Sequence, residues 1–175
     1  MKANKLKPLA LCLSLFSIGI IIGELLSTPV DSQTIQTPKT LIEIQSFNFE
    51  AFFNILSNNL LVAFCLSILG YLTGGIMSCL VLIWNGVIIG LITPKNLNTG
   101  NFFNFIEYFI YHGVIEILAF FLFAIIGMKG FYFYKKLMTY QSLPSLPHWK
   151  EFTLPLSFLI IAAVIESYLI QNYTP

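Results

Sequence analysis

Residues 52–92 form a nearly unbroken apolar stretch, and its length limits the fold more than any other feature of the sequence. As one helix, at about 1.5 Å per residue, it would be about twice as long as the ~30 Å hydrocarbon core of a bilayer is thick. The stretch must therefore fold back once. Thr73, Gly74 and Gly75 lie near its centre, where glycine can adopt the left-handed backbone angles of a tight turn. We predict two transmembrane helices, at about 52–72 and 76–92.

Three more apolar segments are long enough to cross a membrane, at 9–26, about 105–127 and about 152–170. Because 57% of all residues are apolar and only 10% are charged, a water-soluble globule is excluded. We predict an all-α fold, a polytopic integral membrane helical bundle of about five transmembrane helices. Its parts are a basic N-terminus with the first helix (1–26), an external polar loop (27–51) and a four-helix membrane domain (52–175).

The lysines indicate how the bundle is oriented. With five spans, seven of the nine basic residues fall on one side of the membrane, and Lys39 and Lys95 fall on the other. Basic residues accumulate on the cytoplasmic side, so we expect a cytoplasmic N-terminus in the cell membrane. We also expect the first helix to be retained, because Leu25, Leu26 and Ser27 lack the small-x-small pattern of a signal-peptide cleavage site. The seven lysines on the first side are Lys2, Lys5, Lys7, Lys129, Lys135, Lys136 and Lys150.

Several glycines are spaced four residues apart within the apolar segments. Such small-xxx-small pairs let the backbones of neighbouring membrane helices approach closely. We therefore expect helix packing at these glycines, and we assign Gly113 of the fourth segment to the same role. The pairs are Gly19 with Gly23, Gly70 with Gly74, and Gly86 with Gly90.

Five polar side chains lie within the predicted spans, although a charge at membrane depth costs at least ~2.5 kcal/mol. Depths counted from the helix ends place all five between the midplane and the outer surface. They come from four different helices, so the sequence does not establish that they meet. These residues are Glu24, Asn85, His112, Glu116 and Glu166.

Tyr108, His112 and Glu116 follow one another at intervals of four and so share one helical stripe. The imidazole and carboxylate can form an interhelical hydrogen bond that fixes packing. They can also serve a proton or solute pathway, or supply two ligands to a metal that takes Glu166 as a third. An isolated HxxxE spacing does not select among these alternatives.

The chain contains no nucleophile elbow, no phosphate-binding glycine loop and no HExxH pattern, so an enzymatic role is disfavoured and no cofactor is expected. The net charge of +1 argues against binding to nucleic acid. The expected partners are the lipid bilayer and other membrane or cell-envelope proteins. A peptide substrate and a second copy of the chain stay open as further partners.

The order of several short elements resembles the stage II sporulation protein M family, from about Phe53 to the end of the chain. After Glu166, an insertion at 167–173 lengthens the spacing that this family shows. The elements are Asn58-Asn59-Leu60, Gly70 with Gly74, Asn85-Gly86 with Gly90, His112-Gly113-Val114-Ile115-Glu116 and Ala162-Ala163-Val164-Ile165-Glu166.

This resemblance implies a bacterial, multi-helix membrane protein. The family's sporulation member acts without enzymatic activity, in a membrane complex with peptidoglycan-degrading partners. Short relatives accompany circular bacteriocin genes, which implies as an alternative a role in maturation, export or immunity of a peptide. The resemblance also selects Asn85, His112, Glu116 and Glu166 as the core of the polar cluster and leaves out Glu24.

Overall fold

The computed structural model describes residues 6–27, 48–98, 113–139 and 146–169, and within these ranges every regular element is a helix. Five helical segments are long and apolar enough to span a membrane: Lys7–Leu26, Phe49–Leu72, Ile76–Thr93, Val114–Met138 and Lys150–Tyr168. The predicted all-α, five-span bundle is therefore confirmed. The elements are α1 (Leu6–Leu26), α2 (Phe49–Phe64), the π-helix η1 (Cys65–Leu69), α3 (Gly70–Leu72), α4 (Ile76–Asn98), α6 (Val114–Met138) and α7 (Lys150–Leu169).

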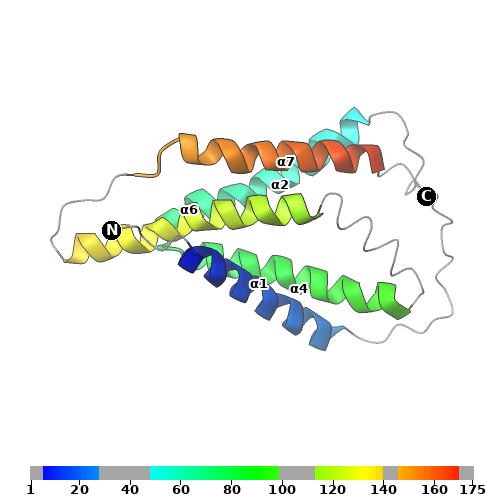
Figure 1. Ribbon diagram of the computed structural model, residues 1–175, viewed down its shortest axis with the longest axis horizontal. Helices are drawn as coiled ribbons and strands as arrows, with labels where there is room; N and C mark the ends of the chain where they lie inside the picture. Colours follow the sequence, from blue (N-terminus) through cyan, green and yellow to red (C-terminus); the bar gives the residue numbers. More distant parts are fainter. Residues whose placement is uncertain (1–5, 28–47, 99–112, 140–145, 170–175) are drawn as a thin grey trace.

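Helix α6 is the centre of the bundle. Figure 1 shows it between the α2–α7 pair and the α1–α4 pair, and it contacts every other helix. Its phenylalanines face both pairs: the ring of Phe121 lies edge-on to Phe16 of α1 at 5.5 Å, and the ring of Phe123 lies 6.3 Å from Phe152 of α7. Burial of these apolar rings on two sides holds the pairs to α6.

The chain reverses between α3 and α4 at Thr73–Gly75, where the sequence predicts a turn. Gly74 and Gly75 have φ angles of 65° and 92°, which favour glycine. The amide of Gly75 donates to the carbonyl of Gly70 at 2.7 Å, and the amide of Gly74 donates to that of Tyr71 at 3.2 Å. This pair of bonds is a Schellman motif, so the turn satisfies helix-end carbonyls that lipid would leave unpaired.

Helix α2 begins three residues earlier than the predicted start near 52. Asn48 caps it, because its side-chain oxygen accepts a hydrogen bond from the amide of Ala51 at 3.1 Å. At its other end α2 continues through η1 and α3 as one membrane-spanning rod.

Helix α6 does not end near Gly127 as predicted but continues to Met138. The prediction is wrong because Gly127 and Gly130 do not end the helix but allow close contact with the backbone of a neighbouring helix. A Cβ atom on Gly127 would collide with the carbonyl oxygen of Leu66, and one on Gly130 with that of Tyr71. The predicted start of this span, near 105, lies outside the described residues.

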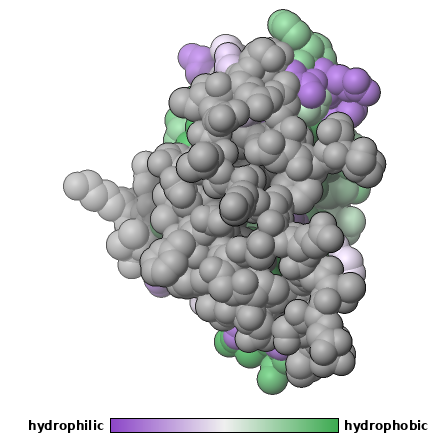
Figure 2. Space-filling model, turned by 90° about the vertical axis from the view of Figure 1, so that its right-hand side faces the viewer, coloured by the Kyte–Doolittle hydropathy of each residue, from purple (hydrophilic) through white to green (hydrophobic). Residues whose placement is uncertain are grey.

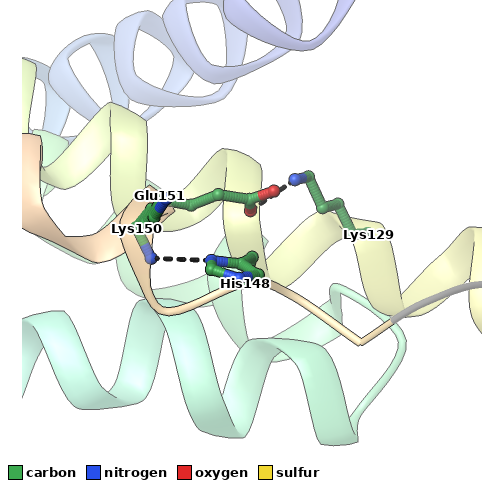
Figure 3. A network of polar contacts seen from close by, with 4 residues as sticks. All are labelled: Lys129, His148, Lys150 and Glu151. Carbon is green, nitrogen blue, oxygen red and sulfur yellow. Dashed lines mark hydrogen bonds and ion pairs between the residues drawn. The ribbon is translucent and has the colours of Figure 1, made fainter.

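The start of α1, the C-terminal part of α6 and the start of α7 lie towards the left of Figure 1, and we call this side the lysine-rich end. These segments carry Lys7, Lys129, Lys135, Lys136 and Lys150. There Lys129 of α6 forms an ion pair with Glu151 in the first turn of α7. The backbone amide of Lys150 also donates to Nδ1 of His148 at 3.2 Å (Figure 3). The ion pair places the first turn of α7 beside Lys129 of α6.

Candidate functional site

Glu116 of α6 and Glu166 of α7 lie at one level of the bundle. Thirteen residues separate Glu116 from Lys129, and fifteen separate Glu166 from Glu151. Because Lys129 and Glu151 are paired, both glutamates lie about 20 Å from the lysine-rich end of these helices. Helices α6 and α7 pack against each other, and we call these two glutamates the carboxyl pair. Two of the predicted site residues therefore lie at the same height on contacting helices.

Both glutamates continue buried stripes of their helices. Glu116 precedes Phe120 by four residues and Phe123 by seven, and both rings are buried. Glu166 follows Ala162 and Leu159, which are also fully buried, by four and seven residues. Each glutamate is itself half-buried, and its place in the stripe puts it on the interior side of its helix.

Asn59 of α2 lies at the same level, although it was not among the predicted site residues. Gly70 and Gly127 approach each other so closely that a Cβ on Gly70 would lie 3.2 Å from the Cα of Gly127. Asn59 and Glu116 each precede these glycines by eleven residues, about 16 Å of helix. Four residues before buried Ala63, Asn59 is on the interior side of α2. In the sequence, the signal that could have identified Asn59 was its position four residues before the apolar residue Ala63, on the same side of the helix.

Asn85 does not join the carboxyl pair. It is half-buried, and its amide donates to the carbonyl of Val81 in its own helix at 2.8 Å. Figure 1 shows that α4 and α6 diverge away from the lysine-rich end, and within the described residues no hydrogen bond joins Asn85 to Glu116. Glu24 is exposed in the last turn of α1, away from the pair.

His112 and Tyr108 lie outside the described residues. Among the residues that the structure does describe, no three histidine, cysteine, aspartate or glutamate side chains form a metal-binding group. The two carboxyl groups of the pair can each accept hydrogen bonds or attract a cation.

Most of the glycines expected at helix contacts lie between α1 and α4 or on α6 and the span that packs against it, whereas Gly74 lies in a turn. In α1 and α4, which run parallel, a Cβ on Gly19 would lie 3.0 Å from the Cα of Gly86, and one on Gly23 would lie 2.9 Å from the Cα of Gly90. Gly70 meets Gly127, as described above, and Gly113 is buried at the start of α6. The prediction that Gly74 packs against a neighbouring helix backbone is corrected. Gly74 lies in the Thr73–Gly75 turn, where an added Cβ would meet the ring of Tyr134 and no backbone atom of the described residues.

The lipid-facing side of α2 carries polar residues that were also missed. Glu50, Asn54, Ser57 and Asn58 are all exposed, and their spacing of three and four residues places them on one side of the helix. We call this set the α2 stripe. Centring the 24-residue span on a ~30 Å core places Asn58 about 10 Å inside the hydrocarbon.

Three other exposed hydroxyl groups in the spans bond to their own helices. Ser14, Thr153 and Ser157 donate to backbone carbonyls three or four residues earlier, at 2.7–2.8 Å. The side chains of Asn54 and Asn58 make no such bond to any part of the chain that the structure describes. An amide at this depth needs a partner, because lipid tails offer none.

The upper edge of Figure 1, where α2 begins, corresponds to the upper edge of Figure 2. Figure 2 shows green apolar residues there beside purple hydrophilic ones. This agrees with the exposure of Phe49 and Phe53 next to Glu50 and Asn54. The start of α2 therefore presents a mixed surface and not a uniformly lipophilic one.

Comparison with known proteins gives one match. The family model described as stage II sporulation protein M matches residues 12–170. No curated protein and no solved structure matches the chain. The match begins within α1, so the resemblance assigned from about Phe53 onward was too short, and Glu24 lies inside the matched region.

Proposed function

This chain belongs to the stage II sporulation protein M family, and from that premise we propose that it is a non-enzymatic subunit of a protein complex in the cell membrane. In this role, α2 docks against a transmembrane helix of another chain. The complex serves the cell envelope, as in sporulation, and the bundle acts as its membrane scaffold.

The observation that carries the proposal is the α2 stripe. Asn54 and Asn58 lie exposed on a membrane-spanning helix, without the hydrogen bond to the helix backbone that Asn85 makes. Polar side chains of this kind join membrane helices by interhelical hydrogen bonds. A helix from another chain would satisfy the amides and remove them from lipid.

The test is recovery of the complex at native expression after extraction in a mild detergent. The wild-type chain should be isolated with companion chains, and the double variant Asn54→Leu/Asn58→Leu should lose them. The matched control is Thr153→Leu/Ser157→Leu on α7, which also replaces two exposed polar residues four apart, but ones that bond within their own helix. Recovery of the wild-type chain as a single polypeptide would refute the proposal.

A second candidate function rests on the carboxyl pair. Glu116 and Glu166 are at one height of the packed helices α6 and α7, about 20 Å from the lysine-rich end, a position suited to handling a proton, a small solute or a peptide near the outer surface. An accessory role in maturation, export or immunity of a peptide such as a circular bacteriocin would use this pair. Under that function, Glu116→Gln should abolish export while the protein level stays constant. Unchanged export would dismiss it.

A further inference from the structure

We propose that the chain docked against the α2 stripe is a second copy of this protein, with two α2 helices running parallel about a two-fold axis perpendicular to the membrane. This inference rests on the proposed function, because it names the partner that α2 contacts. It follows from the chemistry of the stripe and from the depth at which each residue lies.

The polar groups of the stripe are complementary to themselves. A carboxamide both donates and accepts hydrogen bonds, and so does the hydroxyl of Ser57. About a two-fold axis along the membrane normal, each residue of one copy meets the same residue of the other at equal depth. Asn54 and Asn58 therefore meet partners that match them without any further requirement on sequence.

The rest of the stripe fits the same arrangement. Towards the lysine-rich end its line continues through Leu61, Phe64 and Ile68, which are exposed by 65%, 44% and 44%. Together these residues repeat at intervals of three and four, the spacing of a helix–helix seam. The seam is polar in one half of the membrane and apolar in the other. A second copy has the same division at the same depth.

The one charged member does not oppose the pairing. Glu50 is in the first turn of α2, at the edge of the span and beyond the hydrocarbon. Water and salt screen the repulsion between two carboxylates there, and each is stabilised by the N-terminus of its own helix. Interior residues are left undisturbed, because Ala63 of α2, Leu66 of η1 and Gly70 of α3 are buried on the opposite side of this span.

The experiment is disulfide cross-linking in native membranes. In a chain with Cys12, Cys65 and Cys79 replaced by alanine, Leu61→Cys places one thiol on the seam. The control Ile161→Cys is on α7, is 47% exposed, and lies at the same level as Leu61 to within about 2 Å. Mild oxidation should convert Leu61→Cys to a species of twice the 19.8 kDa chain and leave Ile161→Cys at the mass of one chain.

Each other outcome overturns the inference. Equal dimer formation by both variants would mean random collision, and no dimer with either would mean that the α2 faces do not meet. A cross-linked product of another mass, formed only by Leu61→Cys, would show a different partner on the stripe. That last result would leave the proposed function standing, so the two proposals fail separately.

A second measurement uses the chain with its native cysteines. In a mild detergent or in nanodiscs, the wild-type chain should have the mass of two polypeptides. Asn54→Leu/Asn58→Leu should raise the dissociation constant by about tenfold, and Thr153→Leu/Ser157→Leu should leave it unchanged. A wild-type monomer, or equal dissociation constants for all three proteins, would contradict the inference.

Discussion

The parallel contact of α1 with α4 provides the sharpest test of the fold. A Cβ on Gly90 would collide with the carbonyl oxygen of Ile20 and lie 2.9 Å from the Cα of Gly23. Both obstacles are backbone atoms, so a side-chain rotation cannot relieve them and the helices must separate. Gly90→Ala should therefore lower the free energy of unfolding by about 1–3 kcal/mol, the usual cost of overpacking.

Gly23→Ala should cost a similar amount, because its Cβ would collide with the carbonyl oxygen of Val87 and lie 2.9 Å from the Cα of Gly90. The two substitutions act at one crossing point. Once the first has separated the helices, the second has room, so the double variant should be less destabilised than the sum by about 1 kcal/mol or more.

The assay is reversible unfolding in detergent micelles or bicelles for wild type, both single variants and the double variant. Ser17→Ala is the control, since Ser17 is exposed on the other side of α1 and its replacement should change stability by less than about 0.5 kcal/mol. Additive effects of Gly23→Ala and Gly90→Ala, or single effects no larger than that of the control, would refute the close contact of these helices.

Three further predictions concern single residues. Gly74→Ala should destabilise the chain by about 1–2 kcal/mol in the same unfolding assay, because residue 74 has a φ of 65°; an unchanged stability would contradict the turn geometry. Asn48→Ala removes the cap of α2 and should cost about 1 kcal/mol, whereas Asn48→Asp should retain most of the stability. Glu151→Gln should cost under about 1 kcal/mol and lose its effect at high salt, since the ion pair with Lys129 is solvent-exposed; a larger, salt-independent effect would argue against that assignment.

Helix number and fold class were predictable from the sequence because lipid restricts the choices. A membrane-spanning segment must be long, apolar and helical, and the length of 52–92 required a turn, which Gly74 and Gly75 near its centre suit. The local sequence was therefore sufficient to predict this turn. The same holds for α1 and α4, whose glycine spacing indicated close contacts before their partners were known.

Helix ends and partners were less predictable because they depend on tertiary contacts. Gly127 and Lys129 look like the end of a span, yet Gly127 packs against the backbone of Leu66 and the helix continues past both. Likewise, Gly70 has the same spacing to Gly74 as Gly86 has to Gly90. Only the three-dimensional structure places Gly70 against α6 and Gly74 in a turn.

The neighbours Asn58 and Asn59 show that both depth and helical phase are needed to locate a polar side chain in the bundle. Adjacent residues on a helix point about 100° apart, so Asn59 is half-buried on the interior side of α2 and Asn58 is exposed on its outer side. Both lie at the level of Glu116 and Glu166, which means that polar groups at this depth extend from the bundle interior to its surface. A sequence pattern identifies each amide as polar but does not give its depth relative to another helix.

The two ends of the bundle are held differently, and this bears on how docking at α2 would act. At the lysine-rich end, Gly70 meets Gly127, the hydroxyl of Tyr134 donates to the carbonyl of Leu72 at 2.7 Å, and Lys129 pairs with Glu151. Away from that end the α2–α7 and α1–α4 pairs diverge (Figure 1). A helix bound along Asn54 and Asn58 therefore contacts a part of α2 that has fewer backbone contacts with α6. Because the carboxyl pair lies at this same level, docking on the lipid side of α2 and events at Glu116 and Glu166 involve the same, less constrained part of the molecule.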